Sequence, residues 1–389
     1  MDSRRATETV RPVAALLLPV VAAALLLAAC RARPDDGRDL VDRATPAAAD
    51  VDVDASSLLP VDPDVAERLQ QRTGAVIAPP PPAELVGLLG EYRSDESGRE
   101  IMLLERQGRL LLLAAADALH ELEEVSPADG DGSDDRRSFQ LVDLPQARVE
   151  IDAGELTFAD DSYRRVPFPE TTGEIFRIEP MAAISELRER ALAASPPLEE
   201  PAPVRPPDLV ELIDVDPSLR LDIRYAGTRN FMGTEFYLQA RAFLQRPAAE
   251  ALSRAHGDLR EQGFGLLIYD AYRPWHVTKM FWDATPDFQR EFVADPSQGS
   301  RHNRGCAVDL TLVDLQTGEP VPMPSGYDEF SRRAYSDYPA WTTRQRDLRA
   351  LLRQELEEEG FQALPNEWWH FDFAIWRDYP ILDVRFEDL

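Results

Sequence analysis

The most informative stretch of this 389-residue chain is Ser300-Arg301-His302-Asn303-Arg304-Gly305-Cys306-Ala307-Val308-Asp309-Leu310. From Cys306 to Leu312, every second side chain is apolar, which is the period of a β-strand, and Asp309 falls on the other face. His302 precedes this strand in a polar stretch, where we expect a turn. The segment therefore predicts a histidine in a turn and an aspartate on the strand that follows.

A second alternating stretch begins with Glu367-Trp368-Trp369-His370. From Trp369 to Phe373, aromatic side chains on one face alternate with polar side chains on the other. Antiparallel pairing of the two strands would bring Asp309 and His370 side by side, and His302 can reach the same point.

This group of side chains suits a metal ion. Two histidines and one aspartate, here His302, Asp309 and His370, make a three-ligand zinc set that leaves the fourth position open for water. Glu367 is then free to act as general base on that water. We therefore expect one zinc ion per chain and a hydrolytic site.

The first 30 residues have the pattern of an export signal. Three arginines precede an apolar run at 13–27, and Leu27-Ala28-Ala29-Cys30 closes it with small residues. We expect a signal peptide at 1–29. The ending resembles a bacterial lipobox, so we expect lipid on Cys30 and an exported lipoprotein of the cell envelope, on the periplasmic face of a membrane or on the cell surface if there is no outer membrane. The alternative is an ordinary signal peptide followed by a chance cysteine.

Composition divides the rest of the chain. Residues 30–82 are rich in Ala, Asp and Pro and predict a disordered tether. Residues 83–175 predict a small all-β domain without an identified partner, with expected strands at 101–104, 109–113, 138–142, 148–151 and 156–158. This segment loosely resembles the small β-barrel modules of some bacterial serine hydrolases.

A helix and a proline-rich linker are expected at 176–207, followed by a second domain at 208–389. In this domain, apolar stripes predict helices after Pro247, ending near Gly263, and around 348–356, ending near Gly360.

The charge and the cysteines exclude some functions. With 42 basic and 70 acidic residues, the net charge is −28, so we expect no binding to nucleic acid phosphates. The two cysteines allow at most one disulfide. Since Cys30 has a use as the lipid site, we interpret Cys306 as a small buried residue.

The motifs of the C-terminal domain resemble those of the VanX-type D-alanyl-D-alanine dipeptidases. The resemblance covers about residues 210–375 and comprises the two metal-site segments together with Leu221–Ala226, Asn230–Gly233, Asp270–Pro274 and Asp309–Leu312. It implies the fold shared by D-alanyl-D-alanine metallopeptidases and the Hedgehog signalling domain. The expected fold class is thus α+β, with an antiparallel sheet and flanking helices preceded by the all-β domain.

The resemblance also implies roles for individual residues. His302, Asp309 and His370 match the zinc ligands, and Glu367 matches the catalytic base. Three further matches concern the substrate: Arg273 would stabilise the tetrahedral intermediate, Ser300 would lie near the substrate carboxylate, and Asp328 would meet the substrate ammonium group. Arg301 departs from the pattern, because relatives often have serine at this position.

The implied activity is zinc-dependent hydrolysis of the D-alanyl-D-alanine dipeptide in cell-wall peptide turnover. Two alternatives remain open at this point. One is a D,D-carboxypeptidase acting on longer peptidoglycan stem peptides, and the other is a non-catalytic envelope module that binds peptide. Intact Glu367 and Arg273 argue against the second alternative.

Overall fold

The computed structural model describes residues 77–389, except 115–117, 126–135, 168–174 and 199–202. The predicted signal peptide at 1–29, the predicted lipid site Cys30 and most of the predicted tether at 30–82 lie outside the described residues. In the part of the chain that is described, no helix combines the length and the apolar character needed to cross a membrane.

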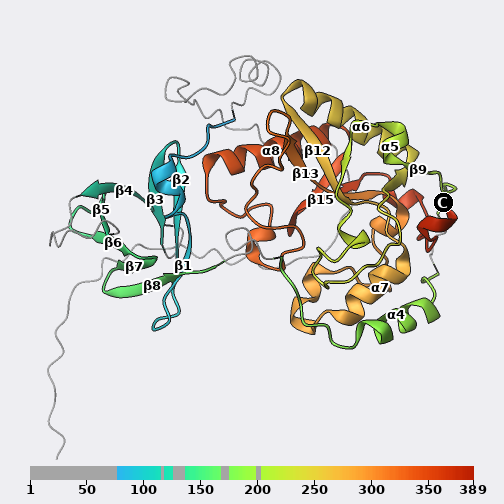
Figure 1. Ribbon diagram of the computed structural model, residues 1–389, viewed down its shortest axis with the longest axis horizontal. Coiled ribbons are helices and arrows are strands. Elements are labelled where there is room, and N and C mark those ends of the chain that lie inside the picture. Colours follow the sequence, from blue (N-terminus) through green and yellow to red (C-terminus); the bar gives the residue numbers. More distant parts are fainter. Residues whose placement is uncertain (1–76, 115–117, 126–135, 168–174, 199–202) are drawn as a thin grey trace, which may run out of the picture. The chain divides into compact units, whose positions relative to one another are not determined.

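Eight antiparallel strands form a closed barrel in the N-terminal part of the described chain (Figure 1). Strand β1 pairs with β2 on one side and with β8 on the other, so the barrel closes and its strands have no free edge. The strands are β1 (Gly90–Arg93), β2 (Glu100–Arg106), β3 (Arg109–Leu113), β4 (Leu119–Val125), β5 (Arg137–Leu141), β6 (Arg148–Asp152), β7 (Glu155–Phe158) and β8 (Asp161–Arg165).

The prediction of a small all-β domain is therefore confirmed. The sequence predicts five of the strands and misses β1, β4 and β8. Each of these three strands buries a single large apolar side chain, namely Tyr92, Leu122 and Tyr163, among polar and charged neighbours. Alternation over so few apolar residues is too weak a signal for a strand.

A five-stranded sheet forms the centre of the C-terminal domain, in the order β10-β12-β13-β15-β14. The pairs β12–β13, β13–β15 and β14–β15 are antiparallel, and the short β10 runs parallel to β12. The strands are β10 (Arg220–Leu221), β12 (Phe264–Asp270), β13 (Ala307–Asp314), β14 (Phe361–Leu364) and β15 (Glu367–Phe373), and a separate pair consists of β9 (Leu209–Glu211) and β11 (Phe243–Gln245).

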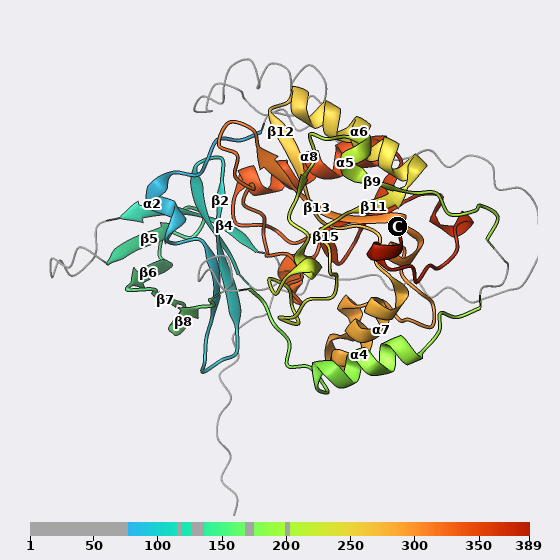
Figure 2. The same ribbon diagram turned by 45° about the vertical axis from the view of Figure 1, so that its right-hand side comes forward.

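Helices lie on both sides of this sheet. Figures 1 and 2 show α6 and α8 on one side and α4 and α7 on the other, and α6 packs on α8 as α4 packs on α7. The expected α+β fold class is thus confirmed. The helices are α2 (Ala83–Val86), α4 (Ile184–Ala193), α5 (Leu212–Val215), α6 (Arg246–Glu261), α7 (Trp275–Ala284) and α8 (Thr343–Glu358).

The helix ends agree with local sequence signals. Pro247 occupies the first turn of α6, where its missing N–H costs nothing. Thr342 caps α8: its hydroxyl accepts a hydrogen bond from the Gln345 amide, and the Gln345 side chain bonds back to the cap.

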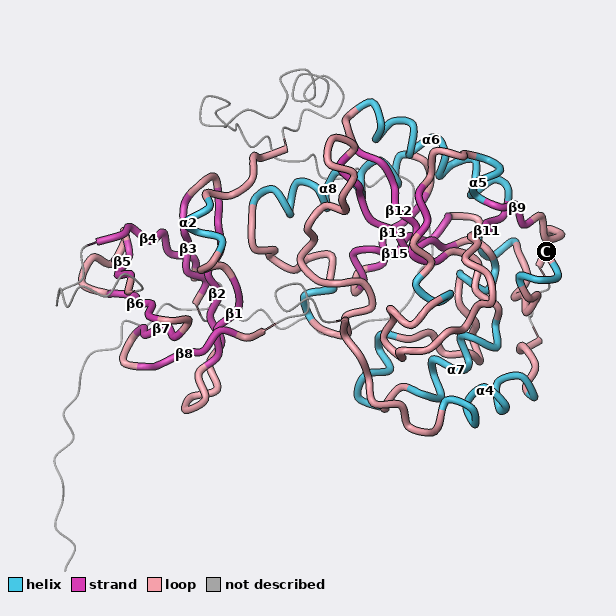
Figure 3. Tube along the Cα trace, in the orientation of Figure 1, coloured by secondary structure: helices cyan, strands magenta, loops and turns pink. Residues whose placement is uncertain are grey.

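Long loops connect these elements, as the tube in Figure 3 shows. They include 3-10 turns at Arg224–Ala226, Asp287–Phe292, His302–Arg304, Arg332–Ala334, Trp376–Asp378 and Phe386–Asp388. The predicted tether also ends in contact with α8, since the Ala78 amide donates to Asp347 over 2.9 Å and Ile77 is buried.

Candidate active site

Three ligand atoms converge at the centre of the C-terminal sheet. Nδ1 of His370 lies 3.0 Å from Oδ1 of Asp309 and 3.1 Å from Nε2 of His302, and the same Asp309 oxygen lies 3.3 Å from Nε2 of His302. All three side chains are buried. The three predicted metal ligands therefore come together in one place.

The outer nitrogens of both histidines are already engaged. Nδ1 of His302 lies 2.6 Å from the carbonyl oxygen of Ala271, and Nε2 of His370 lies 2.8 Å from Oδ1 of Asp372. A carbonyl oxygen can only accept, and the pKa of Asp372 is lowered by His370 despite its burial, so this carboxylate also accepts. Both outer nitrogens are therefore donors.

Because the outer nitrogens are donors, the inner nitrogens of the two histidines have no hydrogen in the neutral rings. In neutral imidazoles, Nε2 of His302 and Nδ1 of His370 each present a lone pair, and these lone pairs face each other and the Asp309 carboxylate. Such an arrangement is repulsive unless a cation lies between the three atoms. Burial acts to lower the pKa of His370, yet the carboxylates of Asp372 and Asp309 outweigh burial and raise this pKa well above its ordinary value. The donor set fits a metal ion.

Strand pairing places two of the ligands. In the β13–β15 register, Asp309 stands directly opposite His370, as the sequence predicts. His302 lies in the 3-10 turn that precedes β13. This turn ends at Gly305, whose φ of 66° is left-handed, and a Cβ there would approach Cδ2 of Leu209 to 2.4 Å. Only glycine fits both constraints.

A hairpin positions Glu367 in the site. Strands β14 and β15 are joined by Pro365 and Asn366, and Glu367 is the first residue of β15. Its Oε2 lies 3.7 Å from Nδ1 of His370, and its side chain is 15% exposed. Burial raises the pKa of Glu367 to about 7, although His370 opposes this shift. The carboxylate thus lies beside the three ligand atoms without being one of the group.

Arg273 is held in the pocket wall by Asp270. Its Nε donates to Oδ2 of Asp270 over 2.9 Å, and its guanidinium group stacks over the rings of Tyr225 and Phe281. One terminal nitrogen lies 3.6 Å from Oδ2 of Asp309. The result is a fixed, buried positive charge next to the ligand group.

Ser300 precedes the three candidate ligands in sequence and Asp328 lies between Asp309 and His370, but both line the same pocket. Oδ2 of Asp328 accepts from the Tyr225 hydroxyl over 2.8 Å, and its backbone is left-handed with φ of 58°. Burial, together with the negative charge of Asp309, raises the pKa of Asp328 well above its ordinary value. The Ser300 hydroxyl accepts from the backbone N–H of His302 over 3.2 Å.

One pocket of about 220 Å³ is lined by all seven residues that the sequence predicts for metal binding, catalysis and substrate binding: Arg273, Ser300, His302, Asp309, Asp328, Glu367 and His370. Pockets for drug-sized ligands usually measure about 300–1,000 Å³. The pocket is therefore suited to a small polar molecule.

Several residues of the site have no role in the sequence prediction. Asp372 orients His370, Asp270 holds Arg273, Tyr225 supports Asp328, and the Tyr327 hydroxyl donates to Oδ2 of Asp309 over 2.9 Å. The sequence pattern could have identified Asp372, because it follows His370 by two residues on the same strand face. It could not have identified the two tyrosines, because the loops that contain them show no periodic pattern.

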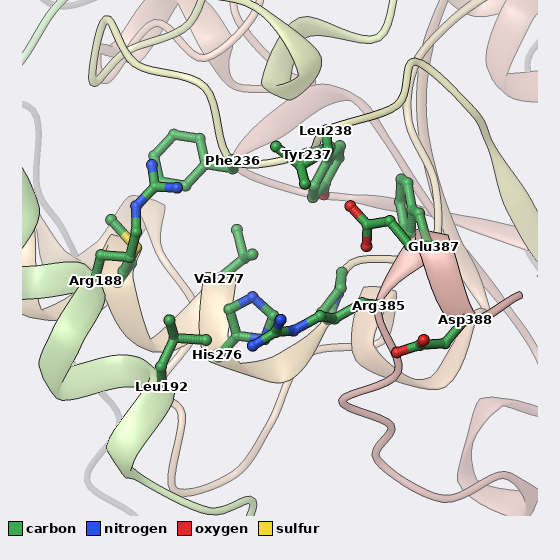
Figure 4. A pocket seen from close by; sticks show the side chains of 13 residues that line it. Arg188, Leu192, Phe236, Tyr237, Leu238, His276, Val277, Arg385, Glu387 and Asp388 are labelled. Carbon is green, nitrogen blue, oxygen red and sulfur yellow. The ribbon is translucent and has the colours of Figure 1, made fainter.

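A second, larger pocket of about 330 Å³ contains none of the predicted site residues. Figure 4 shows Arg188 and Leu192 of α4 on one side and Arg385, Glu387 and Asp388 near the C-terminus on the other. Charges of both signs line it. Size alone therefore does not identify the active site, whereas the convergent ligand atoms do.

Comparison with known proteins agrees with this geometry. Residues 205–378 match the D-ala-D-ala dipeptidase family. A D-alanyl-D-alanine dipeptidase of Escherichia coli K12 is 37% identical over 179 residues, which are 46% of this chain and 91% of that protein. The chain belongs to the D-alanyl-D-alanine dipeptidase family. Dipeptidases of Enterococcus faecium and Streptomyces coelicolor are 33% and 32% identical over 190 residues, each match covering 43% of this chain and 91% of the relative.

The matched family region contains all seven predicted site residues and excludes the barrel. Because the match covers 91% of the E. coli dipeptidase, that relative has no room for a domain of the barrel's size. The barrel is thus an addition to the dipeptidase domain.

Proposed function

We propose that the protein is a zinc-dependent hydrolase of the D-alanyl-D-alanine dipeptide that acts in cell-wall peptide turnover. The observation that carries this proposal is the convergence of three buried lone pairs, from His302, Asp309 and His370, in a small pocket beside Glu367. Membership of the dipeptidase family supports the choice of substrate.

His302, Asp309 and His370 would hold one zinc ion through Nε2, Oδ1 and Nδ1. When bound, zinc lowers the pKa of a water molecule to roughly 7 and polarises the substrate carbonyl. Ala271 and Asp372 keep the two imidazoles in the tautomers that direct these nitrogens inward.

Glu367 would accept and donate the protons that the reaction transfers. Hydrolysis adds the oxygen of water to the carbonyl carbon, breaks the C–N bond and transfers a proton to the leaving nitrogen. A carboxylate 3.7 Å from a ligand nitrogen of His370 is close enough to take a proton from the attacking water and to pass it on to the amine.

Arg273 would stabilise the negative charge that develops on the carbonyl oxygen. Its guanidinium group is fixed by Asp270 and by two aromatic rings, so little reorganisation is needed during the reaction. The loss of one such donor typically reduces the rate by about 10²–10³-fold.

Asp328 and Ser300 would recognise the two ends of the dipeptide. The substrate ammonium group would supply the cation that the buried Asp328 carboxylate needs, and the Ser300 hydroxyl would contact the carboxylate end. In a longer peptide the ammonium group is replaced by an amide, which would leave Asp328 unpaired in a closed pocket. This favours the dipeptide over stem peptides.

The proposal is tested with the full chain by metal analysis and two substrates. We expect one zinc per chain and hydrolysis of D-alanyl-D-alanine, with little release of D-alanine from a pentapeptide ending in D-alanyl-D-alanine. Preferential cleavage of the pentapeptide would identify a carboxypeptidase. A zinc-loaded protein that binds the dipeptide without cleaving it would identify a binding module.

We further propose that the protein is an exported lipoprotein of the cell envelope, anchored through lipid on Cys30. The support comes from the sequence: basic residues before the apolar run at 13–27, and small residues immediately before the cysteine. The dipeptidase domain would then work on the periplasmic face of a membrane, or on the cell surface if there is no outer membrane.

A further inference from the structure

One loop of the described chain reaches from the active site to the barrel. It runs from Gly326 to Thr342, the residue that caps α8. Near its beginning, Asp328 and Phe330 line the active-site pocket, and Phe330 stacks on Phe292 with the ring centroids 5.0 Å apart. We call residues 326–342 the substrate loop.

The far end of the substrate loop is part of the barrel's apolar core. Tyr338 and Trp341 are buried among the core side chains of the barrel. Next to them, the backbone N–H of Glu105 in β2 donates to the carbonyl oxygen of Trp341 over 2.8 Å, and Arg106 donates to the carbonyl oxygen of Pro339 over 2.7 Å. The loop is therefore attached to the barrel by both packing and backbone hydrogen bonds.

A chain of charged side chains joins the barrel to the residue beside Asp328. Glu91 of β1 accepts from Arg333 over 2.8 Å and, with its other oxygen, from the Tyr338 hydroxyl over 2.8 Å. The same Arg333 donates to Glu329 over 2.7 Å. Glu329 is 1% exposed and directly follows Asp328.

We propose that Glu91 of the barrel is a positioning residue for substrate binding: through Arg333 and Glu329 it holds Asp328 where the substrate ammonium group docks. The inference rests on the proposed function. It gives the barrel a role in the specificity of the dipeptidase domain.

Two observations explain why Asp328 needs such support. Its left-handed backbone, with φ of 58°, carries strain, and its side chain is buried in the pocket that it shares with the Asp309 carboxylate. Both features oppose the observed placement, so neighbouring contacts must hold it. Glu329 contributes by accepting from the Ser331 hydroxyl over 2.6 Å as well as from Arg333.

The test compares full-length Glu91→Gln with wild type. The amide keeps the size of the side chain but removes the charge that pairs with Arg333. Substitutions along a coupled chain of this kind change binding by about 2- to 30-fold, so we expect KM for D-alanyl-D-alanine to rise within that range. We expect kcat to change less than about twofold and zinc content to stay at one per chain, because neither Glu367 nor a ligand has moved.

Glu100→Gln is the matched control. Glu100 lies opposite Arg93 in the adjacent strand and forms an exposed ion pair with it inside the barrel. We expect its KM to equal that of wild type. Tyr338→Phe is a second variant, which keeps the ring in the barrel core and removes only the hydrogen bond to Glu91. We expect a smaller rise in KM.

A double-mutant cycle distinguishes positioning of Asp328 from a general effect of the barrel. If Glu91 acts through Asp328, then Glu91→Gln adds little to the KM of Asp328→Asn, whereas independent effects would multiply. Thermal unfolding of each variant identifies loss of fold.

The outcomes separate this inference from the proposed function. Suppose that the wild type is active. If folded Glu91→Gln then has the KM of wild type, or if the effects of the two substitutions multiply in the cycle, the role of Glu91 is overturned and the proposed dipeptidase function still stands. A zinc-loaded wild type without dipeptide hydrolysis would overturn both.

Discussion

Asp372 accepts a 2.8 Å hydrogen bond from Nε2 of His370, two residues earlier on the same strand face. This contact fixes the tautomer of His370 and directs Nδ1 toward Asp309 and His302. Strand geometry provides the arrangement directly, because residues i and i+2 project from the same face.

We predict that Asp372→Asn weakens zinc binding. Loss of a carboxylate that orients a histidine ligand typically reduces metal affinity by about 10- to 100-fold. Competition with a chromogenic chelator measures this. Asp383→Asn is the control, since it alters a similar contact to His276, 2.6 Å long, that lies outside the ligand group. Equal zinc affinities of the two variants would contradict the role given to Asp372.

Glu367→Gln should separate metal binding from chemistry. The amide keeps the shape of the side chain but cannot accept a proton, and general-base assistance is worth about 10²–10⁴-fold in rate. We expect kcat to fall by about 10²–10⁴-fold or more, while the zinc content stays at one per chain. Asp309→Asn should lose zinc and activity together. If Glu367→Gln loses its zinc, Glu367 is a ligand; if it keeps most of its activity, another residue is the base.

Cys30→Ser tests the proposed anchor. Without the thiol, no lipid can be attached at this position, so the protein should leave the membrane fraction or remain unprocessed. Fractionation and gel migration, compared with those of wild type, measure both effects. A variant that stays in the membrane fraction at the processed size would refute lipidation of Cys30.

Gly305→Ala should destabilise the fold around His302. The left-handed backbone at Gly305 and the 2.4 Å approach to Leu209 both oppose a Cβ, and backbone strain of this kind costs about 1–3 kcal/mol. Thermal unfolding should show a lower Tm. Gly257→Ala is the control: Gly257 lies in α6 with open space around its Cα, so the change should raise stability by up to about 1 kcal/mol. A Tm for Gly305→Ala at or above wild type would be inconsistent with this account.

Local periodicity predicted the centre of the dipeptidase domain well. Asp309 and His370 were expected side by side, and the strand register pairs them directly. Each strand has a clear period of two with apolar side chains on the core face. In the barrel, the sequence does not predict β1, β4 and β8. Tyr92, Leu122 and Tyr163 are buried there by the strands around them, which the local sequence of each strand does not reveal.

The sequence by itself determined the three candidate metal ligands, the neighbouring carboxylate and the family, because those residues lie in short motifs whose spacing follows strand and turn geometry. Only the tertiary structure decided that Asp270 holds Arg273, that Tyr225 meets Asp328 and that Glu91 of the barrel reaches the substrate loop. The last two contacts join residues 103 and 242 positions apart. Local periodicity cannot predict contacts between residues so far apart in the sequence, because these contacts form only when distant segments of the chain pack together.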